Sequence, residues 1–295
     1  MKILLLGKNG QVGWELQRAL APLGEIIALD RHSADHCGDL TNPAGIEKTV
    51  RDIKPDVIVN AAAYTAVDKA ESDLLNAELI NATSVKALAC AARDVGALLV
   101  HYSTDYVFDG SGERPWNEDD ATSPLNAYGK TKLQGEESII ANAPHYLILR
   151  TSWVYAAKGN NFAKTMIRLA QERETLSVIN DQFGAPTGAE LIADSTAHAI
   201  KATLANPEKS GIYNLIASGV TTWHAYAEFV INYVREKGLE LKVKAVNTVE
   251  TAAFPTPAKR PSNSRLNTSK FTTAFELTLP EWKVGVKRML DELYN

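Results

Sequence analysis

The first half of the chain alternates between short apolar segments and amphipathic segments, and this alternation restricts its fold more than any other feature. The apolar segments have the length and composition of buried strands, namely KILLL, EIIALD, VIVNAAA, ALLVHYSTDYVF and HYLILRTSWVY. The segments between them space their apolar residues along one helical face, namely QVGWELQRALAPLG, IEKTVRDIKPD, NAELINATSVKALACAARDVG and AYGKTKLQGEESIIANA. This order predicts an α/β fold in which helices cover both faces of a parallel sheet.

The second half of the chain has a different character. Beyond about residue 155 the loops lengthen, and Pro and Asn gather in NDQFGAPTG and FPTPAKRPSNSRLN, between further helical segments. We therefore expect a nucleotide-binding domain over residues 1–155 and a smaller, irregular substrate-binding lobe over residues 156–295. The boundary is soft, because a helix such as Ala189–Leu204 is able to return to the first sheet.

Composition excludes several classes of partner. The 295 residues carry a net charge of −4 without a block of like charge, so we expect no nucleic-acid partner and a small-molecule ligand instead. Only two cysteines occur, Cys37 and Cys90, which matches neither a disulfide framework nor a zinc site and suits a reducing compartment. The N-terminal apolar run Ile3–Leu6 is too short for a signal peptide or a membrane span, so we expect a cytoplasmic protein without a membrane partner.

A glycine-rich loop directly follows the first predicted strand. Gly7, Gly10 and Gly13 stand in GKNGQVG, where the next helix begins and where Gln11 and Val12 lie between the last two glycines. Glycine allows a tight turn and a close approach of backbone to a pyrophosphate, and a helix N-terminus offers free N–H groups to it. The motif in this context predicts a dinucleotide cofactor and a Rossmann-type, doubly wound sheet.

Further residues suit the rest of such a cofactor. Asp30 ends the second strand, where a carboxylate accepts hydrogen bonds from the ribose hydroxyls of NADH, but Arg31 follows and suits the 2′-phosphate of NADPH, so both cofactors stay open. Each of the other candidates is also an ordinary turn or core residue. These are Asp39 and Leu40 around the adenine, Ala61, Ala62 and Ala63 after the third strand, and Tyr102 as a further cofactor-binding candidate.

The catalytic candidates are Thr104, Tyr128 and Lys132. Tyr128 and Lys132 are four residues apart in a predicted helix, so they share one face. Thr104 lies at the carboxyl end of a predicted strand, the edge at which open α/β sheets bind ligands. Taken alone, Tyr-x-x-x-Lys also fits a solvated surface helix and Thr104 a turn cap. Behind a dinucleotide loop, the three residues together predict a site that reduces a carbonyl group, with Lys132 lowering the pKa of Tyr128.

These motifs resemble the extended short-chain dehydrogenase/reductase superfamily, which combines G-x-x-G-x-x-G with Tyr-x-x-x-Lys. NAAAYTAVDKAE, STDYVFDG, PLNAYGKTKLQGE, LRTSWVY and RPSNSRL resemble its branch that reduces 4-keto dTDP-sugars. The resemblance covers nearly the whole chain and implies reduction of the C4 ketone of dTDP-4-dehydro-L-rhamnose by NADPH or NADH. Tyr128 would donate the proton, and Thr104 would donate a second hydrogen bond to the ketone oxygen. Lys132 would also hold the cofactor ribose, and Asp105 and Trp153 would contact the sugar or cofactor side of the cleft.

The resemblance also suggests sites outside this constellation. Arg260 is a candidate clamp for the substrate diphosphate, although a solvated loop arginine fits as well. Glu190 and Asp194 form an i, i+4 carboxylate pair. The family includes Mg²⁺-linked homodimers, which makes the pair a candidate metal site and a homodimer the expected assembly. A solvated helix face is the favoured alternative for that pair.

Other reactions of the superfamily stay open to different degrees. Its dehydratases place an Asp-Glu pair after the catalytic Thr, whereas Asp105 is followed here by Tyr106. Its epimerase-reductases need a Cys/His pair, for which Cys37 and Cys90 are poorly placed. A redox-neutral epimerase, another 4-keto sugar-nucleotide reductase and a non-enzymatic NADP-binding regulatory subunit remain as alternatives to the reductase.

Overall fold

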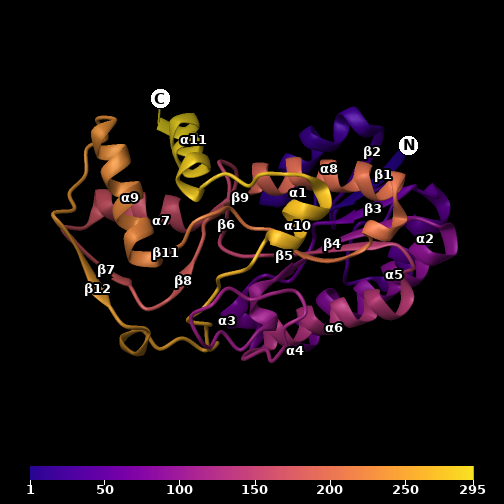
Figure 1. Ribbon diagram of the computed structural model, residues 1–295, viewed down its shortest axis with the longest axis horizontal. Coiled ribbons are helices and arrows are strands. Elements are labelled where there is room, and N and C mark those ends of the chain that lie inside the picture. The colour runs from indigo at the N-terminus through magenta and orange to yellow at the C-terminus, as the bar shows by residue number, and fades with distance from the viewer. Residues whose placement is uncertain (295) are drawn as a thin grey trace.

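The computed structural model describes residues 1–294, and its centre is one sheet of six parallel strands (Figure 1). In spatial order the strands are β10 (Gly211–Asn214), β5 (Tyr146–Thr151), β4 (Leu98–Thr104), β3 (Val57–Asn60), β1 (Lys2–Leu6) and β2 (Glu25–Leu29). The chain runs from β1 outward to β2 and then crosses back to β3, so the switch in strand order lies between β1 and β3. Ligands of such sheets bind outside the carboxyl ends of the strands at this point.

Helices cover both faces of this sheet, as the alternating sequence predicts. One face packs against α1 (Gln11–Leu20), α8 (Ala189–Ala205) and α10 (Ser269–Phe275). The other packs against α2 (Pro43–Ile53), α5 (Ser84–Val95) and α6 (Ala127–Asn142). The two sets lie on opposite sides of the strands in Figure 1. Because both faces are covered, Ile3–Leu6 is wholly buried, and the predicted doubly wound α/β fold is confirmed.

A second, smaller set of elements lies beside this core, at the left of Figure 1. Its apolar clusters join α7 (Phe162–Glu172), α9 (Trp223–Glu236) and α11 (Trp282–Tyr294), with β7 (Thr175–Ile179) paired in parallel to β12 (Ala245–Val249). Two further strand pairs are β6 (Val154–Tyr155) with β9 (Thr187–Gly188) and β8 (Phe183–Gly184) with β11 (Thr221–Thr222). Across residues 1–294, no helix is both long and apolar enough to span a membrane.

The second half of the chain also contributes to the first sheet. Helix α8 packs along α1, and β10 extends the sheet beyond β5, although the sequence did not predict β10 as a strand. The division into a domain of residues 1–155 and a lobe of residues 156–295 therefore stays a prediction. Two elements of the second half, α8 and β10, complete the core that the first half begins.

The long helix predicted after β3 is interrupted. The chain forms α3 (Val67–Ala70) and α4 (Leu74–Glu78), then a π-helical turn over Leu79–Thr83, before α5 begins. Asn81 lies in this turn, buried, and its amide donates to Thr131 Oγ1 and to the Tyr64 carbonyl. The wider turn thus aims a polar side chain at α6 and at the loop after β3, a use for which π-bulges are known.

Short 3₁₀ turns are the remaining elements of regular structure in residues 1–294. They span Ala21–Leu23, Asp105–Val107, Pro207–Lys209 and Thr251–Ala253. The turn over Asp105–Val107 begins where β4 ends, and it places Asp105 and Tyr106 in the lining of the cavity described below.

Candidate functional site

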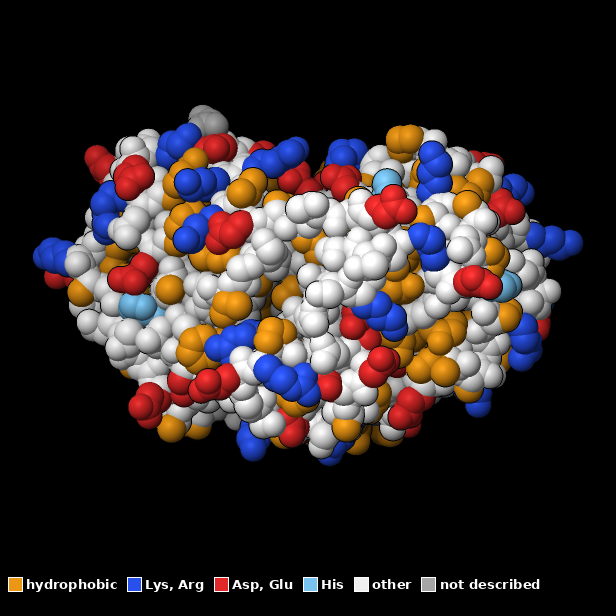
Figure 2. Space-filling model, viewed as in Figure 1, with side chains coloured by type: hydrophobic (Ala, Val, Ile, Leu, Met, Phe, Trp, Pro, Cys, Tyr) orange, Lys and Arg blue, Asp and Glu red, His pale blue; other side chains and the backbone are white. Residues whose placement is uncertain are grey.

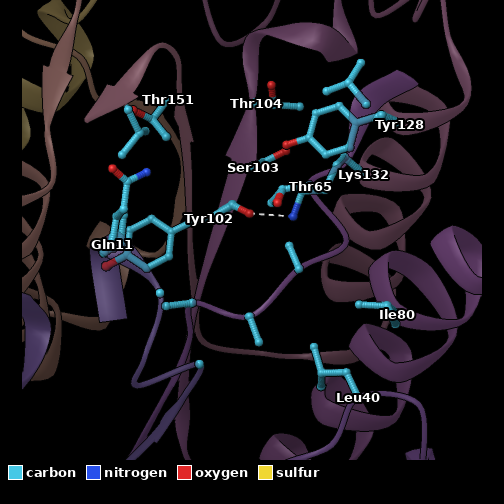
Figure 3. Close-up of a pocket in the computed structure, with 18 of the residues that line it drawn as sticks. Gln11, Leu40, Thr65, Ile80, Tyr102, Ser103, Thr104, Tyr128, Lys132 and Thr151 are labelled. Atoms are coloured by element: carbon cyan, nitrogen blue, oxygen red, sulfur yellow. Dashed lines mark hydrogen bonds between the residues drawn. The ribbon is translucent and has the colours of Figure 1, made fainter. Parts of the chain in front are cut away.

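A cavity of about 950 Å³ opens at the carboxyl ends of β1, β3, β4 and β5 (Figure 3). It lies beside the switch point of the sheet, where a dinucleotide is expected. Most residues that the sequence singled out line it: Gly7, Gly10, Gln11, Val12, Asp30, Arg31, Asp39, Leu40, Ala61, Ala62, Ala63, Tyr102, Thr104, Asp105, Tyr128, Lys132 and Trp153. Gly13, Arg260, Glu190 and Asp194 lie outside its lining. The roles of all these residues remain predictions, but the fold brings the first group together.

The glycine loop has the geometry that its sequence suggests. Gly7 has a φ of +86°, and a Cβ there would lie 2.8 Å from the backbone of Ala61, which follows β3. A Cβ on Gly13 would lie 2.0 Å from the Gly7 carbonyl oxygen, so this glycine lets α1 pack against the loop. Helix α1 begins after Gly10 without a side-chain cap, which leaves its first N–H groups directed toward the cavity. This is the arrangement in which helix N-termini bind phosphate.

Asp30 follows β2 and lies beside the glycine loop. Its carboxylate accepts hydrogen bonds from Asn9 Nδ2 at 2.5 Å and from the backbone N–H of His32 at 2.9 Å. The backbone bond from His32 lowers the pKa of Asp30, with Lys8 acting in the same direction. The side chain is thus held as an anion at the cavity wall beside Arg31. A carboxylate and a guanidinium therefore share the predicted adenosine end of the site.

Tyr128 and Lys132 lie one turn apart on α6 and both point into the cavity (Figure 3). The helix begins at Ala127 because Asn126 caps it, accepting the Gly129 N–H at 2.8 Å. The Tyr128 ring packs edge-on against Tyr106, with 5.6 Å between ring centroids. This packing fixes the direction of the phenol within the site.

Thr104 meets the phenol from the end of β4. Its hydroxyl lies near the Tyr128 phenol, donates to Asp105 Oδ1 at 3.1 Å and accepts the Tyr106 N–H at 3.2 Å. The predicted group of Thr104, Tyr128 and Lys132 therefore exists as one cluster. Its hydroxyl and phenol converge on the same part of the cavity.

One expectation about Tyr128 was wrong. Burial, and then the nearby Asp105 carboxylate, raise the pKa of Tyr128 above its usual value, whereas the sequence suggested that Lys132 lowers it. The hydrogen bonds of the Lys132 ammonium go to other groups, since Nζ donates to the Tyr102 carbonyl at 2.6 Å and lies 3.0 Å from His101 Nε2. The phenol thus stays protonated, which is the state that a proton donor needs.

Asp105 has an unsatisfied oxygen inside the protein. The residue is 2% exposed, and its Oδ2 has no hydrogen-bond partner among the described residues. Burial raises the pKa of Asp105 to about 6, while the nearby hydroxyls of Ser264 and Thr104 act in the opposite direction. A buried acceptor without a partner is costly, so Asp105 Oδ2 is suited to receive a hydroxyl group from a ligand.

Two tryptophans form a wall of the cavity. Trp153 and Trp223 stack with 3.6 Å between ring centroids, and both line the space. Trp153 has a φ of +50°, which is rare for an aromatic residue, and its ring lies against Gly184. A Cβ on Gly184 would lie 2.8 Å from that ring. The sequence singled out Trp153 but not Trp223 or Gly184, which only the fold places against it.

Arg260 lies near the cavity, but it is already paired. Its Nη2 donates to Asp68 Oδ2 at 2.6 Å, and its Nη1 lies 3.4 Å from the Tyr106 hydroxyl. Tyr106 lines the cavity and Arg260 does not, so the guanidinium lies behind the Tyr106 side chain, outside the cavity lining.

The acidic pair on α8 faces arginines. Glu190 lies 3.2 Å from the Arg288 guanidinium, and Asp194 accepts from Arg18 at 2.9 Å. Both line a smaller cavity of about 190 Å³ against α11, remote from Tyr128. Within residues 1–294, no cluster of three or more His, Cys, Asp or Glu side chains has an arrangement suited to a metal ion.

Sequence reasoning missed polar residues behind the cavity. Asn60 and His101 are each 1% exposed; His101 lies next to Lys132, and Asn60 lies next to His101. The signal was present, since a histidine in the apolar run ALLVHY and an asparagine ending VIVN are unusual in buried strands. Their meaning depends on the pairing of β3 with β4, which the sequence does not specify.

Comparison with known proteins identifies the family of the chain. The profile of the RmlD substrate binding domain family matches residues 1–295. The dTDP-4-dehydrorhamnose reductase of Salmonella typhimurium strain LT2 is 64% identical over 295 residues, covering 100% of this chain and 99% of that protein. The dTDP-4-dehydrorhamnose reductase of Bacillus anthracis, solved in complex with NADP, is 35% identical with a TM-score of 0.89 over 99% of each chain.

A third comparison extends the agreement. The dTDP-4-dehydrorhamnose reductase of Clostridium acetobutylicum is 39% identical and superposes with a TM-score of 0.87 over 99% of each chain. Full coverage at these identities confirms the resemblance inferred from the motifs, and the chain belongs to the dTDP-4-dehydrorhamnose reductase family.

Proposed function

We propose that this protein reduces the C4 ketone of dTDP-4-dehydro-L-rhamnose to dTDP-L-rhamnose, with NADPH or NADH as the reductant. The observation that carries the proposal is the convergence of Thr104, Tyr128 and Lys132 on one cavity, in a chain of this family. An NADP-binding regulatory subunit has no need of such a cluster.

The cavity suits a dinucleotide along its whole length. The uncapped start of α1 and the bare backbone of Gly7 and Gly10 suit a pyrophosphate, while Ala61 and its small neighbours leave room beside it. Asp30 and Arg31 suit an adenosine ribose and its 2′-phosphate. When bound, the reduced nicotinamide supplies the hydride.

The chain itself supplies the proton and the orientation of the sugar. The raised pKa of Tyr128 keeps its phenol protonated, so it can donate to the oxygen of the ketone as charge develops there. Thr104 supplies a second hydrogen bond to that oxygen once its hydroxyl turns from Asp105. The unpartnered Oδ2 of Asp105 accepts a sugar hydroxyl, and Trp153 forms the apolar wall beside the ring.

Arg260 is our candidate for the diphosphate. A guanidinium matches phosphate geometry, and a bound diphosphate would compete with Asp68 for it. Mg²⁺ binding by Glu190 and Asp194, a homodimer and a cytoplasmic location stay predictions of the sequence. Both acidic residues already have a guanidinium partner, which argues for ion pairs on α8.

The product of the reaction tests the proposal. Purified protein given NADPH and dTDP-4-dehydro-L-rhamnose should oxidise one NADPH for each sugar reduced. With NADPH deuterated at nicotinamide C4, NMR of the product should find the deuterium at sugar C4. Turnover without net oxidation of NADPH would support the epimerase alternative, and label at another carbon would exclude C4 reduction. Binding of NADPH without any turnover on a panel of 4-keto sugar nucleotides would support the regulatory subunit.

Replacement of Asp30 by Ala should raise the preference for NADPH over NADH, measured as the ratio of the two kcat/KM values. The carboxylate is held as an anion and repels a 2′-phosphate, whereas Arg31 remains to attract it. Asp30→Asn is the matched variant, because it removes the charge but keeps an oxygen that can accept from His32. If both substitutions leave the ratio unchanged, Asp30 does not face the adenosine ribose.

A further inference from the structure

A chain of buried polar groups extends from Lys132 into the sheet. His101 on β4 and Asn60 on β3 are direct partners in the strand register, and each is 1% exposed, as is Lys132. His101 Nε2 lies 3.0 Å from Lys132 Nζ, and His101 Nδ1 lies 3.1 Å from Asn60 Nδ2. Neither Asn60 nor His101 lines the cavity, so any effect on the reaction passes through Lys132.

The donors and acceptors along this chain can be assigned in order. The backbone N–H of Ala62 donates to Asn60 Oδ1 at 3.2 Å, which leaves the Nδ2 of the same amide to donate to His101. His101 Nδ1 must then be the acceptor, and a neutral ring carries its proton on Nε2. That N–H points at Lys132 Nζ. A neutral amine can accept it, whereas an ammonium has only donors.

The groups around His101 and Lys132 also favour a neutral ring and a lowered pKa of the lysine. Burial, followed by the charge of Lys132, lowers the pKa of His101 well below its usual value, so the ring is neutral. Burial lowers the pKa of Lys132 to about 8, and the carboxylate of Glu136 on α6 acts against it. The negative charge of Glu136 is compensated by the Arg150 guanidinium on β5, which donates two hydrogen bonds to the carboxylate. On the cavity side, Lys132 has Tyr128 on its own helix and the Tyr102 carbonyl, with Asp105 beyond the phenol.

We propose that Asn60 and His101 are positioning residues that hold a ring N–H against Lys132 and so make its ammonium a ready proton source for Tyr128. The inference rests on the proposed reduction. In that reaction the Tyr128 O–H bond breaks and the O–H bond of the new sugar hydroxyl forms, leaving a phenolate. A Lys132 N–H bond then breaks as the phenolate takes up that proton and the phenol re-forms, and a hydronium ion of the solvent gives a proton to the amine and becomes water. The ring N–H of His101 stabilises the neutral amine present between these two steps.

The tautomer of His101 is the direct test, and it needs neither substrate nor turnover. In protein labelled with ¹⁵N-histidine, the signals of His101 are those lost in the His101→Phe variant, among the six histidines of the chain. We expect a bare Nδ1 and a protonated Nε2 from about pH 6 to pH 9, across the usual range of histidine titration. A proton on Nδ1 with a bare Nε2, or an imidazolium in this range, overturns the proposal. Because this result is independent of activity, it stands apart from a failure of the proposed function.

The pH profile of kcat/KM tests the effect on Lys132. Reduction needs the ammonium, so the activity should fall on the alkaline side as Lys132 loses its proton. Asn60→Ala removes the amide donor and allows His101 to protonate Nδ1 and accept from Lys132, which should move the alkaline limb to higher pH. Asn60→Asp imposes that tautomer, since a carboxylate can only accept, and should move the limb further, by about one pH unit.

A control distinguishes an effect transmitted through the His101 ring from a direct electrostatic effect of the new carboxylate on Lys132. In a His101→Phe background, Asn60→Asp should move the limb much less than it does with His101 present, because the ring that transmits the change is gone. Equal shifts in both backgrounds would mean that the new charge acts through space, and the proposal fails. It also fails if both Asn60 variants alter kcat or KM while the limb stays in place, since that is the signature of a structural role. If the variants do not fold, the tautomer of the unmodified protein decides.

Discussion

Replacing Tyr128 by Phe should lower kcat for sugar reduction by about 10²–10⁴-fold, the range contributed by a positioned general acid. The substitution removes the hydroxyl that meets Thr104 but keeps the ring that packs 5.6 Å from Tyr106. The affinity for NADPH, measured by fluorescence titration, should therefore change little. Steady-state oxidation of NADPH followed by absorbance provides the rate.

A matched tyrosine supplies the control for this experiment. Tyr213 also uses its hydroxyl inside the protein, donating to the Lys209 carbonyl at 2.8 Å, but it lies outside the cavity lining. Tyr213→Phe should keep kcat near the unmodified value. A Tyr128→Phe enzyme that also keeps it would remove Tyr128 from the role of proton donor.

Replacing Glu136 by Ala should lower the free energy of unfolding by about 3–5 kcal/mol, the usual cost of breaking a buried ion pair from one side. Arg150 donates from Nε to Glu136 Oε1 at 3.0 Å and from Nη2 to Oε2 at 2.6 Å, and the two side chains are 3% and 1% exposed. Without Glu136 the guanidinium keeps its hydrogen bond to the Glu118 carbonyl and its contact with the Phe108 ring, but the buried charge is left without a counter-ion. Urea denaturation followed by circular dichroism measures the change.

The exposed pair of Lys48 and Asp52 is the control for burial. Its atoms approach to 2.5 Å, yet its side chains are 72% and 43% exposed. Asp52→Ala should therefore alter the free energy of unfolding by no more than about 1 kcal/mol. Similar losses for Glu136→Ala and Asp52→Ala would contradict the view that burial, and not distance alone, determines the cost.

The alternation of strands and helices in the first sheet, and the residues of the main site, could be predicted from the sequence because both depend on local patterns. Apolar runs ending in glycine or polar residues predict strands whose carboxyl ends share one edge, and Gly7, Thr104 and Tyr128 follow from that geometry. The spacing of Tyr128 and Lys132 has meaning as soon as their segment is helical. None of these inferences needs to know which strands are neighbours.

Tertiary structure alone decided the features that depend on contacts between distant segments. Strand β10 joins the sheet because β5 offers it an edge, and its four residues carry too short a pattern to predict that pairing. The pKa of Tyr128 is raised because packing buries the phenol beside Asp105, which outweighs a lysine one helical turn away. Asn60 and His101 matter only because β3 and β4 pair in the register that places them side by side behind Lys132. Strand order, burial and register are properties of the folded chain, since each depends on which surfaces exclude water together.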